Sequence, residues 1–128
     1  MHPATRFLAI VALWAGPISA FATVDCEQQG PTMEAVRQCL LDSRQQQVDS
    51  AYRALKRKLD QRNPDAANRL AKSQASWARF AGDTCDYMKA ANPRQMMPGD
   101  AWINCWVDFS DARVRILNKW EAQLEAPH

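Results

Sequence analysis

Residues 100–124 read DAWINCWVDFSDARVRILNKWEAQL and carry the pattern that decides the fold. A row of mostly large side chains recurs at spacings of four, three, four, three and four: Trp102, Trp106, Phe109, Arg113, Ile116 and Trp120. Because an α-helix has about 3.6 residues per turn, these spacings place the row on one helix face. Asp100 offers a side-chain cap for the first turn. The stretch therefore predicts an amphipathic helix that begins after Asp100.

Two earlier stretches show the same periodicity. A second helix is predicted to begin at Asn63-Pro64-Asp65, since Asn caps a helix, Pro is accepted at its first position and Asp complements the helix dipole. Its inner face reads Leu70, Gln74, Trp77, Ala81, Thr84 and Met88. The first helix is predicted over 32–61, with Thr32 as its cap. Its apolar stripe consists of Met33, Val36, Leu40, Val48, Tyr52, Leu55 and Leu59.

The connections between these helices set the topology. A short turn at Asn63 makes the first two antiparallel, and a loop of poor helix character, residues 91–99, lets the third return beside them. No stretch alternates apolar and polar residues as a half-buried strand does. The sequence predicts an all-α fold, a three-helix up-down-up bundle, in one domain of residues 23–128.

The first 22 residues have the features of a cleaved signal peptide. A positive start, residues 1–6, precedes a short apolar run, residues 7–15, and Ala20-Phe21-Ala22 offers the small-x-small pattern that a signal peptidase accepts. The run is too short for a permanent anchor, and no later segment approaches the roughly 18 apolar residues that span a bilayer. We expect cleavage after Ala22 and a periplasmic or secreted protein without a stable membrane anchor. An uncleaved anchor is the alternative.

Four cysteines, Cys26, Cys39, Cys85 and Cys105, follow the predicted signal peptide. An exporting compartment favours oxidation, and the predicted topology brings all four to one end of the bundle. They predict two disulfides, for which the sequence leaves three connectivities open. We favour Cys26 with Cys39 and Cys85 with Cys105, since each closes a short loop. No Cys-x-x-Cys pair occurs, so we expect neither a metal site nor a redox-active pair, and no cofactor.

Charge is distributed unevenly, although the net charge is only +2. Residues 37–72 hold nine basic and four acidic side chains, whereas residues 83–111 hold five Asp against Lys89 and Arg94. Mixed-sign runs on a helix are usually a solvated face, which is the favoured interpretation. The alternative is a basic flank that binds anionic envelope polymer or a membrane-associated partner. Export argues against nucleic acid as a partner.

The sequence contains no recognisable set of catalytic side chains. His2 leaves with the predicted signal peptide and His128 is the last residue, so neither is placed as a general base in a core site. Asp83 and Asp86 could share a helix face like a paired-carboxylate site, but no substrate-positioning motif accompanies them. We therefore expect a protein that is not an enzyme, with a hydrolase built on these carboxylates as the weakest alternative.

Polar residues interrupt two of the apolar stripes. Gln74 and Arg113 are predicted to bond across the second and third helices and fix their register, because buried polar groups need partners. The aromatic residues of the same stripes are predicted to pack as core rather than to form a ligand platform. They are Trp77, Phe80, Trp102, Trp106, Phe109 and Trp120.

Taken together, these residues resemble the N-terminal domain family of the lysozyme inhibitor LprI, over residues 25 to about 124. The family's Asp-Cys start, second cysteine and helical tyrosine are matched by Asp25, Cys26, Cys39 and Tyr52. Its Gln-x-x-Trp-x-x-Phe segment and third cysteine are matched by Gln74, Trp77, Phe80 and Cys85. Its fourth cysteine followed by Thr-x-x-Arg is matched by Cys105, Ser110 and Arg113. The resemblance implies an exported helical domain and suggests binding and inhibition of lysozyme.

The chain departs from the family pattern in two places. The family usually has Arg-Asp directly after the phenylalanine, whereas Ala81-Gly82 stands here, with Asp83 one place later. Arg79 and Asp83 are candidates for the same polar contact. The family also tends to have Asn where this chain has Asp49.

The stretch from Met88 to Asp100 is the best candidate for contact with another protein, since loops held by a rigid scaffold carry recognition, although a loop can also merely bridge two helices. Lysozyme depends on two carboxylates in its cleft, so a protruding cation is a sensible way to block it. Lys89 and Arg94 are such cations, and Met96 and Met97 add adaptable apolar surface. We predict a non-catalytic binder that occludes lysozyme or a related wall hydrolase. The alternative is a structural envelope protein that uses its basic flank, residues 53–72.

Overall fold

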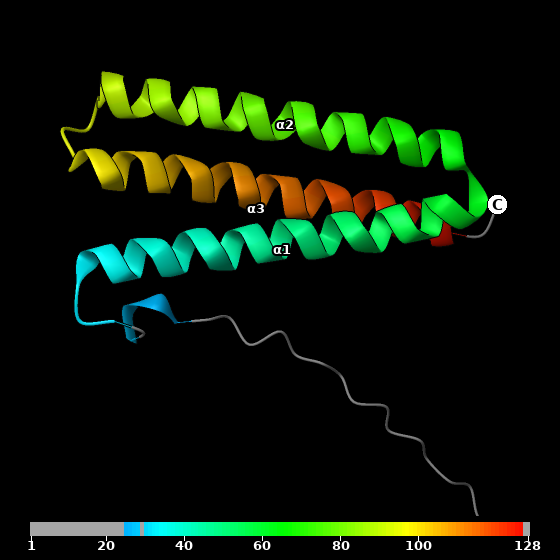
Figure 1. Cartoon of the computed structure of the whole chain (residues 1–128), viewed down its shortest axis with the longest axis horizontal. Helices are drawn as coiled ribbons and strands as arrows, with labels where there is room; N and C mark the ends of the chain where they lie inside the picture. The colour runs from blue at the N-terminus through cyan, green and yellow to red at the C-terminus, as the bar shows by residue number, and fades with distance from the viewer. Residues whose placement is uncertain (1–24, 29, 127–128) are drawn as a thin grey trace, which may run out of the picture.

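The computed structural model of the chain describes residues 25–28 and 30–126. Within them lie a short 3-10 helix, η1 (Cys26–Gln28), and three long helices, α1 (Met33–Arg62), α2 (Pro64–Ala91) and α3 (Pro98–Glu125). The helices run up, down and up, and α3 packs against both α1 and α2 (Figure 1). The predicted all-α three-helix bundle is confirmed. The predicted signal peptide, residues 1–22, lies outside the described residues.

A single residue, Asn63, reverses the chain between α1 and α2. Its backbone N–H donates to the carbonyl oxygen of Leu59 at 2.7 Å, which closes α1. Its side-chain oxygen accepts from the N–H of Ala66 at 3.1 Å, which caps α2. Pro64 takes the first position of α2, where its missing N–H costs no helical hydrogen bond. Thr32 caps α1 in the same way as Asn63 caps α2, so these helix ends lie within one residue of their predicted positions.

The start of α3 differs from the prediction, because the helix begins at Pro98 rather than after Asp100. No side chain caps this end of α3. The Asp100 carboxylate instead accepts a hydrogen bond from Nε of Arg37 in α1 at 2.7 Å. Proline is well accepted at the first helical position, so α3 includes Pro98 and Gly99, and the loop shrinks to residues 92–97. Asp100 therefore joins α3 to α1 through a side-chain hydrogen bond and does not cap α3.

The core consists of two clusters, one toward each end of the bundle. Toward the Asn63 turn, all three helices contribute buried side chains: Ala51, Leu55, Leu70 and Leu117. Toward the opposite end, aromatic and sulfur-containing residues predominate: Ala81, Cys85 and Trp106 are buried, with Leu41, Trp77, Trp102, Cys105 and Phe109 packed against them. Helix α3 contributes to both clusters, which explains why its sequence pattern is the most informative about the fold.

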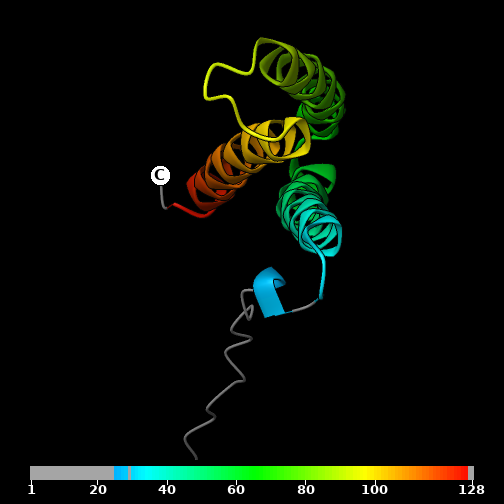
Figure 2. The same ribbon diagram turned by 90° about the vertical axis from the view of Figure 1, so that its left-hand side faces the viewer.

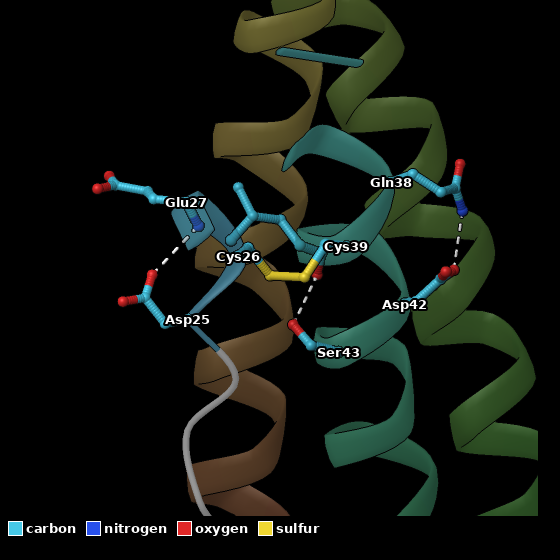
Figure 3. Close-up of a disulfide and its surroundings, with 8 residues drawn as sticks. Asp25, Cys26, Glu27, Gln38, Cys39, Asp42 and Ser43 are labelled. Carbon is cyan, nitrogen blue, oxygen red and sulfur yellow. Dashed lines mark hydrogen bonds between the residues drawn. A yellow bond between two sulfur atoms is a disulfide. The ribbon is translucent and has the colours of Figure 1, made fainter. Parts of the chain in front are cut away.

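Both disulfides have the favoured pairing, Cys26–Cys39 and Cys85–Cys105, with Cα atoms 5.5 Å apart in each. The first fastens η1 to the start of α1 (Figure 3). The second joins the last part of α2 to the first part of α3, across the loop that connects them. Both bonds lie at the end of the bundle opposite Asn63, as predicted. We call this the disulfide end, and it comprises η1, the loop at 92–97 and the adjoining turns of the three helices.

The prediction that the aromatic row packs as core is wrong for two of its members. Phe80 is 61 % exposed and Trp120 is 39 % exposed. Phe80 lies at the edge of the α2–α3 contact, with its ring edge-on to Phe109 at a centroid distance of 5.6 Å. Two partner helices cover only part of a helix surface, and these two residues lie at the margin of that covered part.

Arg113 fixes the register of α2 against α3. The residue is buried, and its Nε donates to Oε1 of Gln74 at 3.0 Å, the contact that the sequence predicted. Its guanidinium lies 5.7 Å from the ring centroid of Trp77 and 5.6 Å from that of Trp120. Burial lowers the pKa of Arg113, and the buried charge is stabilised by the two rings, by the Gln74 amide oxygen and by the Ser73 hydroxyl oxygen, which accepts from Nη2 at 3.4 Å. Ser110, one turn earlier on α3, is fully buried.

We expect Arg113→Lys to lower the free energy of unfolding by roughly 1–3 kcal/mol, because an ammonium cannot both replace the Nε hydrogen bond and stack on two rings. Denaturant unfolding followed by circular dichroism measures the change. Arg115→Lys, at an exposed position two residues on, is the matched control and should shift stability by less than about 0.5 kcal/mol. Equal stability of the Arg113 variant and the parent protein would contradict the assigned role.

We expect the paired substitution of Cys85 and Cys105 by Ala to lower the free energy of unfolding by about 3 kcal/mol, since the bond restricts the unfolded chain. Thermal unfolding under non-reducing conditions measures this loss. An unchanged unfolding midpoint would show that the bond does not brace the bundle.

Candidate functional site

The disulfide end brings together segments that are far apart in the sequence. Here α1 begins, α2 ends and α3 begins, so the loop at 92–97 and η1 lie at the same end of the molecule (Figure 1). Figure 2 looks onto this end, with the loop beside the first turn of α3. The covalent and polar ties described above hold all of these segments to the bundle. The molecule thus presents a braced surface rather than free helix ends.

The loop has a defined internal structure. Asn92 adopts the left-handed conformation, φ 36°, that closes α2, and asparagine tolerates this region better than most residues. Its side chain accepts from the N–H of Met96 at 2.9 Å and donates to the carbonyl oxygen of Met96 at 2.8 Å. The N–H of Gln95 donates to the carbonyl oxygen of Asn92 at 3.0 Å. These hydrogen bonds hold the loop against Asn92, its first residue, so the loop has a defined conformation before any partner binds.

The four candidate contact residues lie at the disulfide end but differ in setting. Arg94 and Met97 are exposed, and Met97 is 66 % exposed. Met96 is half-buried, with its sulfur 3.8 Å from the amide nitrogen of Asn104 in α3. Lys89 belongs to the last turn of α2 rather than to the loop. The structure therefore separates two exposed loop residues from a lysine on the adjoining helix.

A groove of about 230 Å³ opens at this end between the three helices. We call it the groove. Its lining comes from α1 (Glu34, Arg37, Gln38 and Leu41), α2 (Lys89) and α3 (Gly99, Trp102 and Ile103). Leu41, Trp102 and Ile103 supply its apolar part, and Lys89 contributes a cation. No sequence pattern predicted this arrangement, because its residues come from three separate helices.

The two cations of the groove are in different electrostatic states. Arg37 donates from Nε to Asp100 at 2.7 Å and lies 3.3 Å from Glu34, and the hydrogen bond to Asp100 is the main reason why the pKa of Arg37 is raised. Lys89 forms no ion pair with a residue that the structure describes. The Arg37 charge is therefore compensated within the protein, whereas that of Lys89 is directed to solvent or to a ligand.

Two exposed apolar residues at this end were not predicted from the sequence to be on the surface. Met33 is 61 % exposed and Tyr87 is 65 % exposed. Met33 was assigned to the inner stripe of the first helix, which is wrong, because as the first residue of α1 it extends beyond the packed part of the bundle. Tyr87 is off the inner face of α2, and only the folded topology shows that it lies toward the disulfide end. Methionine and tyrosine are both enriched where proteins contact one another.

The residues of the family motif serve the scaffold rather than the exposed surface, with one exception. Gln74, Trp77 and Arg113 meet in the α2–α3 contact, and Ser110 is buried close to it in the chain. Phe80 is the exposed exception. Their arrangement positions α2 and α3, and through them the ends of the loop.

The two acidic residues considered for catalysis have different surroundings. Asp86 accepts a hydrogen bond from the indole N–H of Trp102 at 2.8 Å, which holds α2 to α3. Asp83 and Arg79 are exposed, and neither forms a side-chain hydrogen bond with a residue in the described ranges, so no substitute for the family's Arg-Asp contact is visible there. Within the described part of the chain, no group of three or more His, Cys, Asp or Glu side chains gathers as a metal site would.

Part of the basic flank, residues 53–72, is compensated by neighbouring carboxylates. Ion pairs join Lys56 to Asp60, Arg69 to Asp65, and Lys58 to both Glu121 and Glu125, and Arg44, which precedes the flank on α1, pairs with Asp111. The Arg44 contact is close, 3.0 Å from Nε to the carboxylate oxygen, but it lacks hydrogen-bond alignment. Among the flank residues, Arg53, Arg57, Arg62 and Lys72 form no ion pair with a described residue, although Arg62 donates to the carbonyl oxygen of Leu124. The flank is thus a solvated face whose charges are only partly paired within the protein.

No helix in the described part of the chain combines the length and the apolar character needed to cross a bilayer.

Comparison with known proteins places the chain in a family. No curated protein and no solved structure matches it. The family model described as "Lysozyme inhibitor LprI" matches residues 25–117, which include both disulfides, the loop and most of all three helices. The chain therefore belongs to the LprI family of lysozyme inhibitors.

Proposed function

We propose that this protein binds lysozyme or a related cell-wall hydrolase and inhibits it without catalysing a reaction. The observation that carries the proposal is the family match over residues 25–117. The disulfide end supports it independently, because exposed Arg94, Met97, Met33 and Tyr87 gather there on a braced scaffold. Cationic and adaptable apolar side chains of this kind are typical of protein contact surfaces.

A cation presented by the loop provides a physical means of inhibition. Lysozyme cleaves its glycan substrate with two carboxyl groups that flank the scissile bond. A guanidinium can bond such a carboxylate through two parallel N–H donors, and Arg94 forms no ion pair with a described residue of its own chain. Met97 would cover apolar surface beside it. Because the loop is already ordered by Asn92, little conformational entropy is lost on binding.

We further propose that residues 1–22 direct export and that residues 23–128 act in the periplasm or outside the cell. Two disulfides support this, since such bonds form and persist in oxidising compartments. A wall hydrolase would be met in the same compartments.

The structural-envelope alternative is weaker, because the family match favours inhibition and because part of the basic flank is already compensated by ion pairs. A cation that is already paired contributes less to the attraction of an anionic polymer. Salt-sensitive retention on anionic envelope material, without hydrolase inhibition, would favour that alternative.

We expect the purified, oxidised protein to slow lysozyme-catalysed lysis of cell walls, and Arg94→Glu to raise the inhibition constant by roughly tenfold or more, because it sets a carboxylate against the carboxylates of the cleft. Turbidity loss of a wall suspension at several inhibitor concentrations measures both. Arg57→Glu makes the same charge change at an exposed, unpaired position of α1 and is the matched control.

The control variant should inhibit like the parent protein. Absence of inhibition by the parent protein at micromolar excess, against lysozymes of more than one class, would refute the proposed function. Equal weakening by Arg94→Glu and Arg57→Glu would refute the loop as its site.

A further inference from the structure

We infer that the groove is a subsite for a carboxylate-bearing side chain, an Asp or Glu of the bound hydrolase, with the carboxylate at Lys89. The inference rests on the proposed function for the identity of the partner. That the ligand is a carboxylate is inferred from the residues in and around the groove. The inference assigns to Lys89 a role separate from that of the loop cation Arg94.

Of the two cations that line the groove, Lys89 alone forms no ion pair with a described residue, and the carboxylates of Glu34, Asp86 and Asp100 lie around the groove as well. Arg37 is paired with Asp100 and Glu34. Asp86, one turn before Lys89 on α2, is engaged by the indole N–H of Trp102. Lys89 has no ion-pair partner in the described part of the chain. An anion that enters the groove therefore gains the attraction of Lys89 without first breaking an ion pair of that residue.

The apolar lining suits the stem of an acidic side chain. Leu41, Trp102 and Ile103 line the groove beside Lys89. The volume of about 230 Å³ is below the roughly 300–1,000 Å³ of pockets that enclose whole small molecules. This size favours one side chain inserted from a larger partner over a free ligand enclosed by the protein.

The groove is held in shape before any partner arrives. The ring of Trp102 is fixed by its hydrogen bond to Asp86 at 2.8 Å and by stacking on Trp106, with ring centroids 5.4 Å apart. The Arg37–Asp100 bond holds α1 to α3 along one side. A preformed site loses less entropy on binding than one that must order its walls.

The groove adjoins the loop on both sides of the sequence. Lys89 lies three residues before Asn92, where the loop begins, and Gly99 lies two residues after Met97, where it ends. A hydrolase that covers the loop would therefore extend over the mouth of the groove. Binding of one acidic side chain there would anchor the loop at the edge of the catalytic cleft.

A probe that needs no hydrolase tests the chemistry of the groove. We expect the α-N-methylamide of N-acetyl-glutamate, whose only charge is its side-chain carboxylate, to shift the indole N–H signal of Trp102 when it is added to the ¹⁵N-labelled oxidised protein. That signal is assigned by its loss in Trp102→Phe. The α-N-methylamide of N-acetyl-glutamine, which has nearly the same shape and no charge, should not shift it, and neither should N-acetylglucosamine. The shift should disappear in Lys89→Met, which keeps the aliphatic stem, and persist in Lys72→Met, an exposed control on the same helix.

Equal shifts with the amide, a shift with the sugar alone, or no shift with the carboxylate at tens of millimolar would each overturn the inference. In the lysis assay, we expect Lys89→Met to raise the inhibition constant by roughly five- to tenfold and Lys72→Met to leave it unchanged. The Lys89 effect should shrink as salt is added.

The two proposals fail in distinguishable ways. A parent protein that does not inhibit, but whose Trp102 signal responds to the carboxylate through Lys89, would refute the proposed function and support the carboxylate site. A parent protein that inhibits equally well as Lys89→Met would refute the role of the groove and leave the proposed function standing.

Discussion

The bond between Cys85 and Cys105 joins α2 and α3 close to where the chain leaves one helix and enters the other. Two long helices connected by a short loop would otherwise be free to separate at their ends, and the loop would move with them. The bond holds their Cα atoms 5.5 Å apart at these positions, and Cys85 is fully buried in the aromatic core cluster. Everything proposed for the disulfide end depends on this constraint, because a contact surface must keep its shape to bind tightly.

A side-chain hydrogen bond and the other disulfide hold α1 and η1 at the same end. The Arg37–Asp100 hydrogen bond connects residues 63 positions apart in the sequence, and the Cys26–Cys39 disulfide joins η1 to α1. At mid-bundle, Arg113 and Gln74 set the register between α2 and α3. The family motif thus acts at a distance from the exposed surface, since it fixes the helices from which that surface is built.

The disulfide end presents cations without ion-pair partners beside exposed apolar side chains. Toward the Asn63 turn, ion pairs compensate Lys56, Lys58 and Arg69, whereas the other flank cations form none with a described residue. At the disulfide end, Lys89 and Arg94 have no ion-pair partner among the described residues, and Met33, Tyr87 and Met97 are exposed at the same end. Unpaired cations beside apolar side chains favour association with a partner that carries carboxylates near an apolar surface.

The sequence predicted the features that depend on local chemistry. Helical spacing predicted three helices, and Asn63 and Pro64 predicted the reversal between α1 and α2. The predicted topology placed the four cysteines at one end, and the short loop that each bond closes favoured the pairing that is observed. What it missed depends on distant neighbours. The side chain of Asp100 is of a type that caps helices, but in the structure it accepts a hydrogen bond from Arg37 of α1 and so joins α3 to α1. Phe80 keeps the spacing of a core residue but lies at the margin of the α2–α3 contact. The groove has no sequence signature, because three helices share its lining.

Hydrogen exchange of the oxidised protein with and without bound lysozyme tests the central claim most directly, since it reports which backbone segments a partner covers. The account predicts added protection in residues 88–102 and at the start of α1, with residues 53–72 unchanged. Protection confined to residues 53–72, or an equal change along the whole chain, would contradict it.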